Sequence, residues 1–310
     1  MPTVSVVIPT YNRSQYILEC IESVFDQSYR DFEILVIDDG SIDDTKIKLG
    51  PLIKKNQIRY FNNIHNNAST ARNLGIKNSI GELIAFLDSD DLFYPDKLER
   101  QVHYFQQNPD AKIVHANFEK FDDLGNFLGV RNTIFFSGNI YPQILEHWDM
   151  LMATSSVMVR ADVFSEAGLF DENLKYGEDL DMWARISKQY SFHHIPESLV
   201  KVRVHDDNQS KNKVKLAEMH LPYLQKALAT DKRFGNVDVN RIYSKMFCYM
   251  GLNILIDGSK KDMHPARKLL LVSLKYRPWQ IKSWGGYLFS FLNAPIRHLL
   301  GNLIRKLRDK

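Results

Sequence analysis

The first third of the chain alternates short apolar runs with segments in which apolar residues recur every three or four positions. The apolar runs predict buried strands at residues 4–9, 32–37, 58–61 and 83–87. A helix is predicted to follow Ser14, whose side chain is expected to cap it. Further helices are predicted to end at about residue 55 and to span residues 70–78 and 95–107. Strands that alternate with helices in this way favour a mostly parallel sheet with helices on both faces. The predicted fold class is therefore α/β.

The pattern changes twice further along the chain. Strand-like runs continue at 113–118, 156–160 and 199–203, with helices predicted at 161–167 and 178–190. Beyond about residue 211 the strand pattern stops, and helices are predicted near 211–230, 238–257, 264–276 and 295–309. The sequence therefore predicts one domain of residues 1–210, followed by a helical extension of residues 211–310.

Charge is distributed unevenly between these two regions. The whole chain carries a net charge of +3, but residues 259–310 hold twelve Lys or Arg and two acids, so the extension is basic and the rest is acidic. The predicted helix at 295–309 combines an apolar stripe with basic residues, and aromatic residues precede it. These features are typical of a helix that lies on an anionic membrane surface. The alternative is that the stripe packs against the protein itself or a partner subunit.

Composition and missing motifs narrow the class of protein. The chain is 44% hydrophobic and 25% charged, which is ordinary for a folded protein. Its first residues lack a basic segment and cleavage site, and no apolar run is long enough to cross a bilayer, so we expect a cytoplasmic protein with two reduced cysteines. The glycine-rich dinucleotide motif, the P-loop, and the zinc-protease and α/β-hydrolase motifs are absent. No nucleic-acid-binding module is present either, so we expect no nucleic acid partner.

Acidic residues follow two of the predicted strands. Asp38 and Asp39 come after the second strand, and Asp88, Asp90 and Asp91 come after the fourth. In a parallel sheet the carboxyl ends of the strands meet at one edge, where ligands bind. Mg²⁺ and Mn²⁺ take one or two carboxylates together with the phosphates of a substrate. The pattern therefore favours a metal-and-phosphate site, although acids also cap helices and solvate turns.

Five segments, taken in order, resemble the motifs of family 2 glycosyltransferases, which have the GT-A fold. They are VSVVIPTYN at 4–12, IDDGS at 37–41, ARN at 71–73, LDSDD at 87–91 and GEDLD at 177–181. The resemblance covers about residues 1–210 and implies a nucleotide-binding part at about 1–112 and an acceptor part at about 113–210. One departure is that Asn66 and Asn67 stand where relatives usually carry glycines. Asparagine tolerates the left-handed backbone region, so we expect the loop to survive.

The resemblance implies a role for five residues in binding the nucleotide. Pro9 and Tyr11 would line the base pocket, and Asp39 would accept a hydrogen bond from the base, usually uracil. Arg72 would lie near the base and phosphates, and Asp88 would face the ribose or the surroundings of the metal. An ordinary packing or solvent-exposed role is the competing interpretation for each of them.

The resemblance also implies the metal ligands and the catalytic base. Asp90 would bind a divalent metal, Mn²⁺ or Mg²⁺, and His205 would be a further ligand. Asp179 would be the base that takes the proton of the acceptor hydroxyl. The competing interpretations are a purely structural role for His205 and, for Asp179, a favourable interaction of its charge with the helix dipole.

These roles imply an inverting, metal-dependent transfer of sugar from a nucleotide diphosphate-sugar, a UDP-sugar by the resemblance. The acceptor would be a hydroxyl of a glycan or lipid-linked glycan in cell-surface polysaccharide synthesis. Two alternatives remain open: a nucleotidyltransferase acting on sugar phosphates, and a non-catalytic protein that binds sugar nucleotides.

Overall fold

The structure is a computed structural model, and the chain forms two compact units, Met1–Asp206 and Asp207–Lys310. The residues that it describes are 1–64, 67–131, 133, 137–141, 143–146, 152–174, 177–205, 239–256, 263–292 and 296. The predicted helices at 211–230 and 295–309 therefore fall outside the described residues, apart from Ile296. The functional division at residue 210 stays a prediction.

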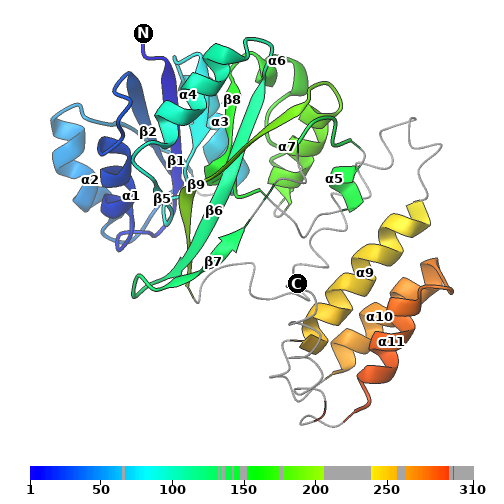
Figure 1. Ribbon diagram of the computed structural model, residues 1–310. Helices are drawn as coiled ribbons and strands as arrows, with labels where there is room; N and C mark the ends of the chain where they lie inside the picture. The colour runs from blue at the N-terminus through cyan, green and yellow to red at the C-terminus, as the bar shows by residue number, and fades with distance from the viewer. Residues whose placement is uncertain are drawn as a thin grey trace. The chain divides into compact units, whose positions relative to one another are not determined.

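The first unit is built on one sheet (Figure 1), whose strands follow the order β3-β2-β1-β4-β8-β6-β9-β5, with β7 paired to β6. The strands are β1 (Val4–Thr10), β2 (Phe32–Asp38), β3 (Arg59–Asn62), β4 (Leu83–Phe86), β5 (Leu92–Phe93), β6 (Ile113–Asp122), β7 (Phe127–Arg131), β8 (Met158–Arg160) and β9 (Phe192–Val204). Pairs β3–β2, β2–β1, β1–β4 and β6–β9 are parallel, and the pairs that involve β5, β7 or β8 are antiparallel. The predicted mostly parallel sheet is confirmed.

The helices of this unit connect the strands. They are α1 (Ile17–Phe25), α2 (Thr45–Lys54), α3 (Ala68–Asn78), α4 (Lys97–Gln107), α5 (Gln143–Glu146), the 3₁₀ turn η2 (Thr154–Ser156), α6 (Val163–Ala167) and α7 (Glu178–Ser187). The expected cap at Ser14 is wrong. Helix α1 begins at Ile17, and the backbone N–H of Ser14 donates to Asp43 Oδ2 at 3.0 Å.

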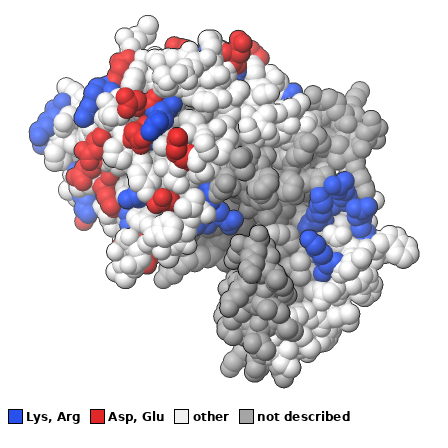
Figure 2. Space-filling model, in the orientation of Figure 1, with Lys and Arg blue, Asp and Glu red and all other residues white. Residues whose placement is uncertain are grey.

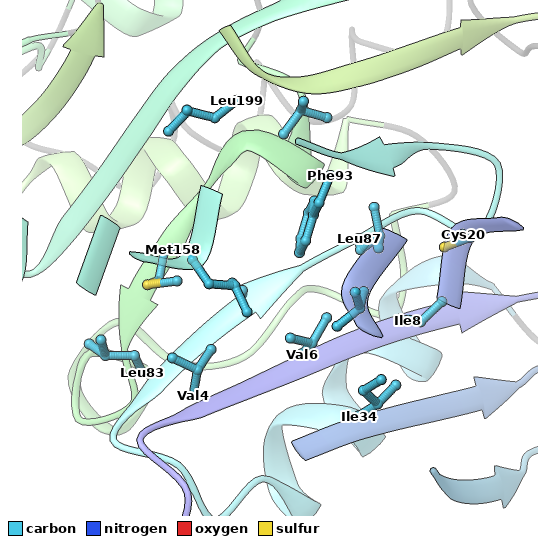
Figure 3. Close-up of a cluster of buried hydrophobic side chains, with 14 of the residues drawn as sticks. Val4, Val6, Ile8, Cys20, Ile34, Leu83, Leu87, Phe93, Met158 and Leu199 are labelled. Carbon is cyan, nitrogen blue, oxygen red and sulfur yellow. The ribbon is translucent and has the colours of Figure 1, made fainter. Parts of the chain in front are cut away.

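Helices cover both faces of the sheet because side chains alternate along each strand. In β1, Val4, Val6 and Ile8 point to one face, where they join a buried cluster with apolar residues of α1 and α4. Figure 3 shows part of this cluster. Val7 points to the opposite face and packs against Gly75 of α3. The strand is buried on both sides, which explains its unbroken apolar run.

Two short strands were not predicted. Strand β5 has only two residues, too few for a period to show, and β7 is largely exposed, so its sequence carries no apolar alternation. Pattern analysis detects strands by the face they bury, and β7 buries little.

The second unit contains α9 (Val239–Ile256), α10 (His264–Tyr276) and α11 (Ile281–Phe289), which contact one another. The helices predicted at 238–257 and 264–276 are confirmed, and α11 was not predicted. Within the described part of the chain, no helix is both long and apolar enough to span a bilayer.

The contact between Gly75 and Val7 yields a stability prediction. A Cβ at Gly75 would lie 2.3 Å from Val7 Cγ1, so an added methyl group forces α3 away from β1. We expect Gly75→Ala to lower the free energy of unfolding by about 1–3 kcal/mol, measured by equilibrium urea denaturation.

Gly50→Ala is the matched control, because Gly50 also lies within a helix and a Cβ there would have nothing within 4 Å. Its effect should stay below about 1 kcal/mol. Equal effects of the two substitutions would contradict the close approach of α3 to the sheet.

Candidate active site

Three of the five predicted nucleotide-binding residues, Tyr11, Asp39 and Asp88, follow three adjacent parallel strands. Thr10 ends β1 and is paired with Asp38 at the end of β2, while β4 lies on the other side of β1. The N–H of Asp39 donates to the carbonyl of Thr10 at 2.8 Å. Tyr11, Asp39 and Asp88 therefore lie at one edge of the sheet, as the alternation of strands and helices predicted.

The loops after β1 and β2 are locked together. The N–H of Asn12, which has a φ of 50°, donates to Ser41 Oγ, and Asn12 Oδ1 accepts from the N–H of Ile42, both at 2.9 Å. Pro9 is half-buried at the end of β1, and Tyr11 is 37% exposed. The two joined loops thus leave an aromatic ring partly exposed to solvent, and a planar ring system can stack on such a surface.

The two carboxylates at the end of β2, Asp38 and Asp39, have different surroundings. Asp38 is buried and accepts from the N–H of Ser41 at 2.8 Å and from the hydroxyl of Tyr60 at 2.7 Å. Burial and this bond to Asp38 raise the pKa of Tyr60. Asp39 accepts from Asn63 Nδ2 at 2.9 Å. Asp38 is thus fully engaged in holding the turn.

Arg72 joins two segments that are far apart in the sequence. It comes from α3 and is 5% exposed. One terminal nitrogen lies 2.9 Å from Asp88 Oδ1, and the other lies 2.9 Å from Glu178 Oε1. Burial opposes its charge, but Asp88 and Glu178 outweigh that effect and raise the pKa of Arg72. The turn after β4 and the start of α7 are therefore brought together around one buried cation.

The unusual asparagine at the start of α3 has a clear structural role. Asn67 has an extended backbone, with φ of −172°, so this residue does not use the tolerance of asparagine for the left-handed region. Its Oδ1 accepts from the N–H of Thr70 at 2.9 Å, while Thr70 Oγ1 lies within hydrogen-bond distance of the Asn67 N–H, which forms a capping box. Asn66 lies outside the described residues.

The buried side chain of Asp91 holds the turn after β4 in place. The buried Asp91 accepts from Ser155 Oγ at 2.6 Å and from the N–H of Arg203 at 3.0 Å, and Ser155 Oγ in turn accepts from the N–H of Asp88. Burial raises the pKa of Asp91 well above its usual value, and the charges of Asp90 and Asp88 add to this. Asp91 thus fixes the turn from inside the protein.

Arg203, a residue that sequence analysis passed over, supports the same turn. Its Nε donates to the carbonyl of Asp90 at 3.0 Å, and its guanidinium lies over the rings of Tyr16 and Phe121, at 4.8 and 4.4 Å. A signal was present: Arg203 stands two residues before His205, at the end of an extended segment in which residues two apart share a face.

The two predicted metal ligands lie side by side. His205 Nε2 is 2.9 Å from Asp90 Oδ2, and Arg13 Nε is 3.5 Å from the same oxygen. His205 is buried and its ring lies 5.3 Å from that of Tyr16. One carboxylate and one imidazole suit Mn²⁺ or Mg²⁺ once substrate phosphates complete the set. Among the described residues, no group of three His, Cys, Asp or Glu forms a complete metal site.

Asp179 lies in the first turn of α7, which begins after Gly177 with a φ of 73°. Burial raises the pKa of Asp179, Arg72 lowers it and Asp88 raises it further. Glu178 is ion-paired to Arg72, and the buried Asp181 accepts from Arg185 Nε at 2.8 Å. Within the described part of the chain, Asp179 is the one of these three acids that makes no direct ion pair with an arginine, although the charge of Arg72 acts on it from further away. Its carboxylate is therefore the best placed of the three to accept a proton.

Two surface hollows lie apart from these residues. One, of about 470 Å³, is lined by Tyr29 and by residues from the stretch 96–106. The other, of about 540 Å³, is lined by residues from two stretches, 107–111 and 189–193. Neither is lined by a predicted site residue. The carboxylates at the sheet edge, and not these hollows, therefore define the candidate site.

The sequence is similar to those of glycosyltransferases. The family model described as glycosyl transferase family 2 matches residues 5–167. A Rickettsia felis protein described as an uncharacterized glycosyltransferase is 44% identical over 201 residues, which are 65% of this chain and 33% of that protein. Chondroitin synthase of Escherichia coli is 29% identical over 234 residues, which are 74% of this chain and 33% of that enzyme. The chain thus spans about a third of the length of these relatives.

The fold is similar to those of two solved GT-A structures. S. aureus TarS 1–349 in complex with UDP-GlcNAc gives a TM-score of 0.68 at 16% identity, covering 93% of this chain and 90% of that one. The mannosyltransferase PcManGT from Pyrobaculum calidifontis, in complex with GDP-Man and Mn²⁺, gives 0.61 at 17% identity, covering 96% and 87%. The predicted GT-A fold, with a helical C-terminal region, is confirmed.

The bridge through Arg72 yields a stability prediction. Arg72→Met keeps most of the apolar stem but leaves Glu178 and Asp88 without their partner. Removing one member of a buried ion pair costs about 3 kcal/mol, so we expect a loss of that order in the free energy of unfolding at neutral pH. The loss should shrink as pH falls and the carboxylates become protonated.

Arg100→Met is the matched control. Arg100 is paired with Asp96 on the surface, where solvent screens the two charges, so its replacement should change the free energy of unfolding little. Urea denaturation at two pH values separates the two variants. If Arg72→Met is no more destabilising than Arg100→Met, the bridge does not hold α7 to the sheet edge.

Proposed function

The chain belongs to glycosyl transferase family 2, and from this premise we propose that it transfers a sugar from a nucleotide diphosphate-sugar to a hydroxyl acceptor with inversion at the sugar carbon. The observation that carries the proposal is the Arg72 bridge. It brings the Asp88–Asp90 turn and the Asp179 end of α7 to the same sheet edge. This closeness supports the proposal that one site holds both the donor phosphates and the proton acceptor.

The donor is proposed to be a UDP-sugar. Tyr11 and Pro9 would stack against the base, Asp39 would accept its N–H, and Arg72 with Asp88 would face the ribose and phosphates. The neighbours of known structure support a nucleotide-sugar, since one binds UDP-GlcNAc and the other GDP-Man. Their bases differ, so the choice of uracil rests on Asp39 alone.

Asp90 and His205 are proposed to hold Mn²⁺ or Mg²⁺. The complex of PcManGT with Mn²⁺ supports a metal in this kind of site. When bound, the ion would neutralise the charge that develops on the leaving nucleoside diphosphate. Arg13 and His205 flank the Asp90 carboxylate, with Arg13 Nε at 3.5 Å and His205 Nε2 at 2.9 Å from Oδ2.

Asp179 is proposed to be the catalytic base. A hydroxyl group is a poor nucleophile until a carboxylate takes its proton during attack. Burial raises the pKa of Asp179, which makes its carboxylate a stronger base than an exposed aspartate, while Arg72 keeps the ionised form accessible. A single displacement with this base opposite the leaving group inverts the sugar carbon.

The acceptor is proposed to be a glycan or lipid-linked glycan of a surface polysaccharide, reached on the cytoplasmic side of a membrane. The similarity to chondroitin synthase supports a glycan acceptor. Attachment to the membrane through residues 295–309 stays a prediction, because those residues lie outside the described ones apart from Ile296. The family disfavours a nucleotidyltransferase, which would release pyrophosphate in place of a nucleoside diphosphate.

The first functional prediction concerns the metal. UDP with Mn²⁺ should raise the melting temperature of the intact chain in a thermal-shift panel of nucleotides and nucleotide-sugars, because a ligand that binds the folded state stabilises it. Asp90→Ala should abolish the Mn²⁺-dependent part of that shift and leave the unliganded melting temperature nearly unchanged.

Asp110→Ala is the control, since Asp110 is an exposed acid in the turn between α4 and β6. It should retain the full shift. An Asp90→Ala protein that UDP and Mn²⁺ still stabilise as they do the intact chain would rule out the ligand assignment.

The second functional prediction concerns the base. Asp179→Asn keeps the shape of the side chain and removes its ability to take a proton. Donor binding should stay close to normal, while transfer falls by ~10²–10⁴. In the intact enzyme, transfer should rise with pH as Asp179 ionises. Because the pKa of Asp179 is raised, this rise should occur at a higher pH than the ionisation of an ordinary aspartate, and the variant should lose it.

Asp181→Asn is the matched control. Asp181 lies one half-turn along the same helix and is bound to Arg185, so its loss should lower stability and leave transfer within a few-fold. Should Asp179→Asn retain near-normal transfer, Glu178 and Asp181 become the candidates for the base. Donor binding with no transfer by the intact chain would instead favour a non-catalytic binding protein.

A further inference from the structure

Helix α11 carries its large apolar side chains on the side facing solvent. Ile281, Trp284 and Leu288 are spaced at i, i+3 and i+7, so they share one helix face, and they are 83%, 48% and 65% exposed. Trp279 just before the helix and Phe291 just after it are 89% and 58% exposed. These five residues are called the α11 apolar face below.

The inner side of α11 is made of small residues. Ser283, Gly286 and Ser290 are buried at the same i, i+3, i+7 spacing. A Cβ at Gly286 would lie 2.5 Å from Leu252 Cδ2 of α9, and Ser283 Oγ lies 2.7 Å from Ser273 Oγ of α10. A helix on the surface of a soluble domain normally buries its apolar stripe. Helix α11 does the reverse, so its apolar face fits an apolar environment outside the three helices.

The face is held in place by defined contacts. Trp284 Nε1 donates to the carbonyl of Pro278 at 2.8 Å. Arg267 donates to both the hydroxyl and the carbonyl of Ser290 at 2.9 Å, and its guanidinium lies 4.0 Å over the ring of Phe291. Both ends of the face are therefore fixed by groups of this unit.

The charge around the face has one sign. The described residues of this unit, 239–256 and 263–292, include seven Lys or Arg and no Asp or Glu. Figure 2 shows Lys and Arg gathered on this unit, with no acidic side chain in its visible described surface. Arg277 and Lys282 are exposed and lie within the stretch that carries the apolar face, and Lys275 is exposed on α10.

Exposed tryptophans on an apolar helix face with basic neighbours match one kind of partner. Trp sits well at the boundary between headgroups and acyl chains, Lys and Arg extend toward anionic headgroups, and the apolar side chains enter the region below. We propose that the α11 apolar face docks this protein on the surface of a bilayer that contains anionic lipid. The surface lies ahead of the predicted helix at 295–309 and does not depend on the proposed transferase activity.

The test is flotation of the full chain with vesicles. The intact protein should float with phosphatidylcholine vesicles that contain about one third phosphatidylglycerol, and much less with phosphatidylcholine alone, because the basic residues respond to surface charge. Ile281→Glu combined with Leu288→Glu places two acids on the face while residues 293–310 stay intact. This double variant should reduce the bound fraction on the order of tenfold.

Ile47→Glu combined with Leu124→Glu is the matched control, with the same charge change at residues of the first unit that are 74% and 87% exposed. It should float like the intact chain. Both variants should keep the intact melting temperature and its UDP–Mn²⁺ shift, so that the docking proposal and the transferase proposal fail independently.

Three results would overturn the docking proposal. The first is that the intact chain does not float with anionic vesicles, even if a chain that lacks residues 293–310 does. The second is flotation of the Ile281→Glu, Leu288→Glu variant equal to that of its control. The third is an intact chain that does not float and is dimeric by light scattering, with a monomeric double variant, which would assign the face to a second copy.

Discussion

The candidate site depends on one buried cation. Arg72 is almost without solvent, and its charge is tolerated because Asp88 and Glu178 lie 2.9 Å from its two terminal nitrogens. These partners come from the turn after β4 and from the first turn of α7, which are about ninety residues apart. Satisfying this single charge therefore joins the sheet edge at which the donor phosphates are proposed to bind to the helix that carries the proposed base. The close approach of α3 to β1 at Gly75 is what delivers Arg72 to that place.

A second set of buried contacts holds the Asp90 turn from the opposite side. Asp91 binds Ser155 of η2 and the backbone of Arg203 in β9, and Arg203 binds the carbonyl of Asp90. A buried carboxylate costs free energy unless donors satisfy it, so these contacts fix the geometry of the turn. The proposed metal ligand is thus presented by two strands that are not neighbours in sequence, β4 and β9. The same strand β9 carries Arg203 and leads directly to His205.

The two units divide the chemistry of the chain. Carboxylates dominate the candidate site of the first unit, whereas the described helices of the second unit carry only basic charge. In α11 small residues form the packing surface, because Gly286 and Ser283 allow a close approach to α9 and α10. The large apolar residues are thereby left for the outside. A unit built in this way suits the proposed attachment to a membrane surface, while the first unit carries the site proposed for a sugar nucleotide.

The sequence by itself determined most strands and helices of the first unit, and it placed the acids at one sheet edge. Both inferences rest on local periodicity, since an apolar run or a helical stripe is written within ten or fifteen residues. It missed β7 and α11, whose apolar or small residues do not face the core in the usual way. Only the tertiary structure decided which acids serve the fold: Asp38 is held by Tyr60, Asp91 by Ser155 and Arg203, and Asp181 by Arg185. Most of these partners lie tens of residues away, and the desolvation of a carboxylate depends on everything packed around it. A motif shows that acids are present, but burial and the donors brought by distant strands decide what each of them does.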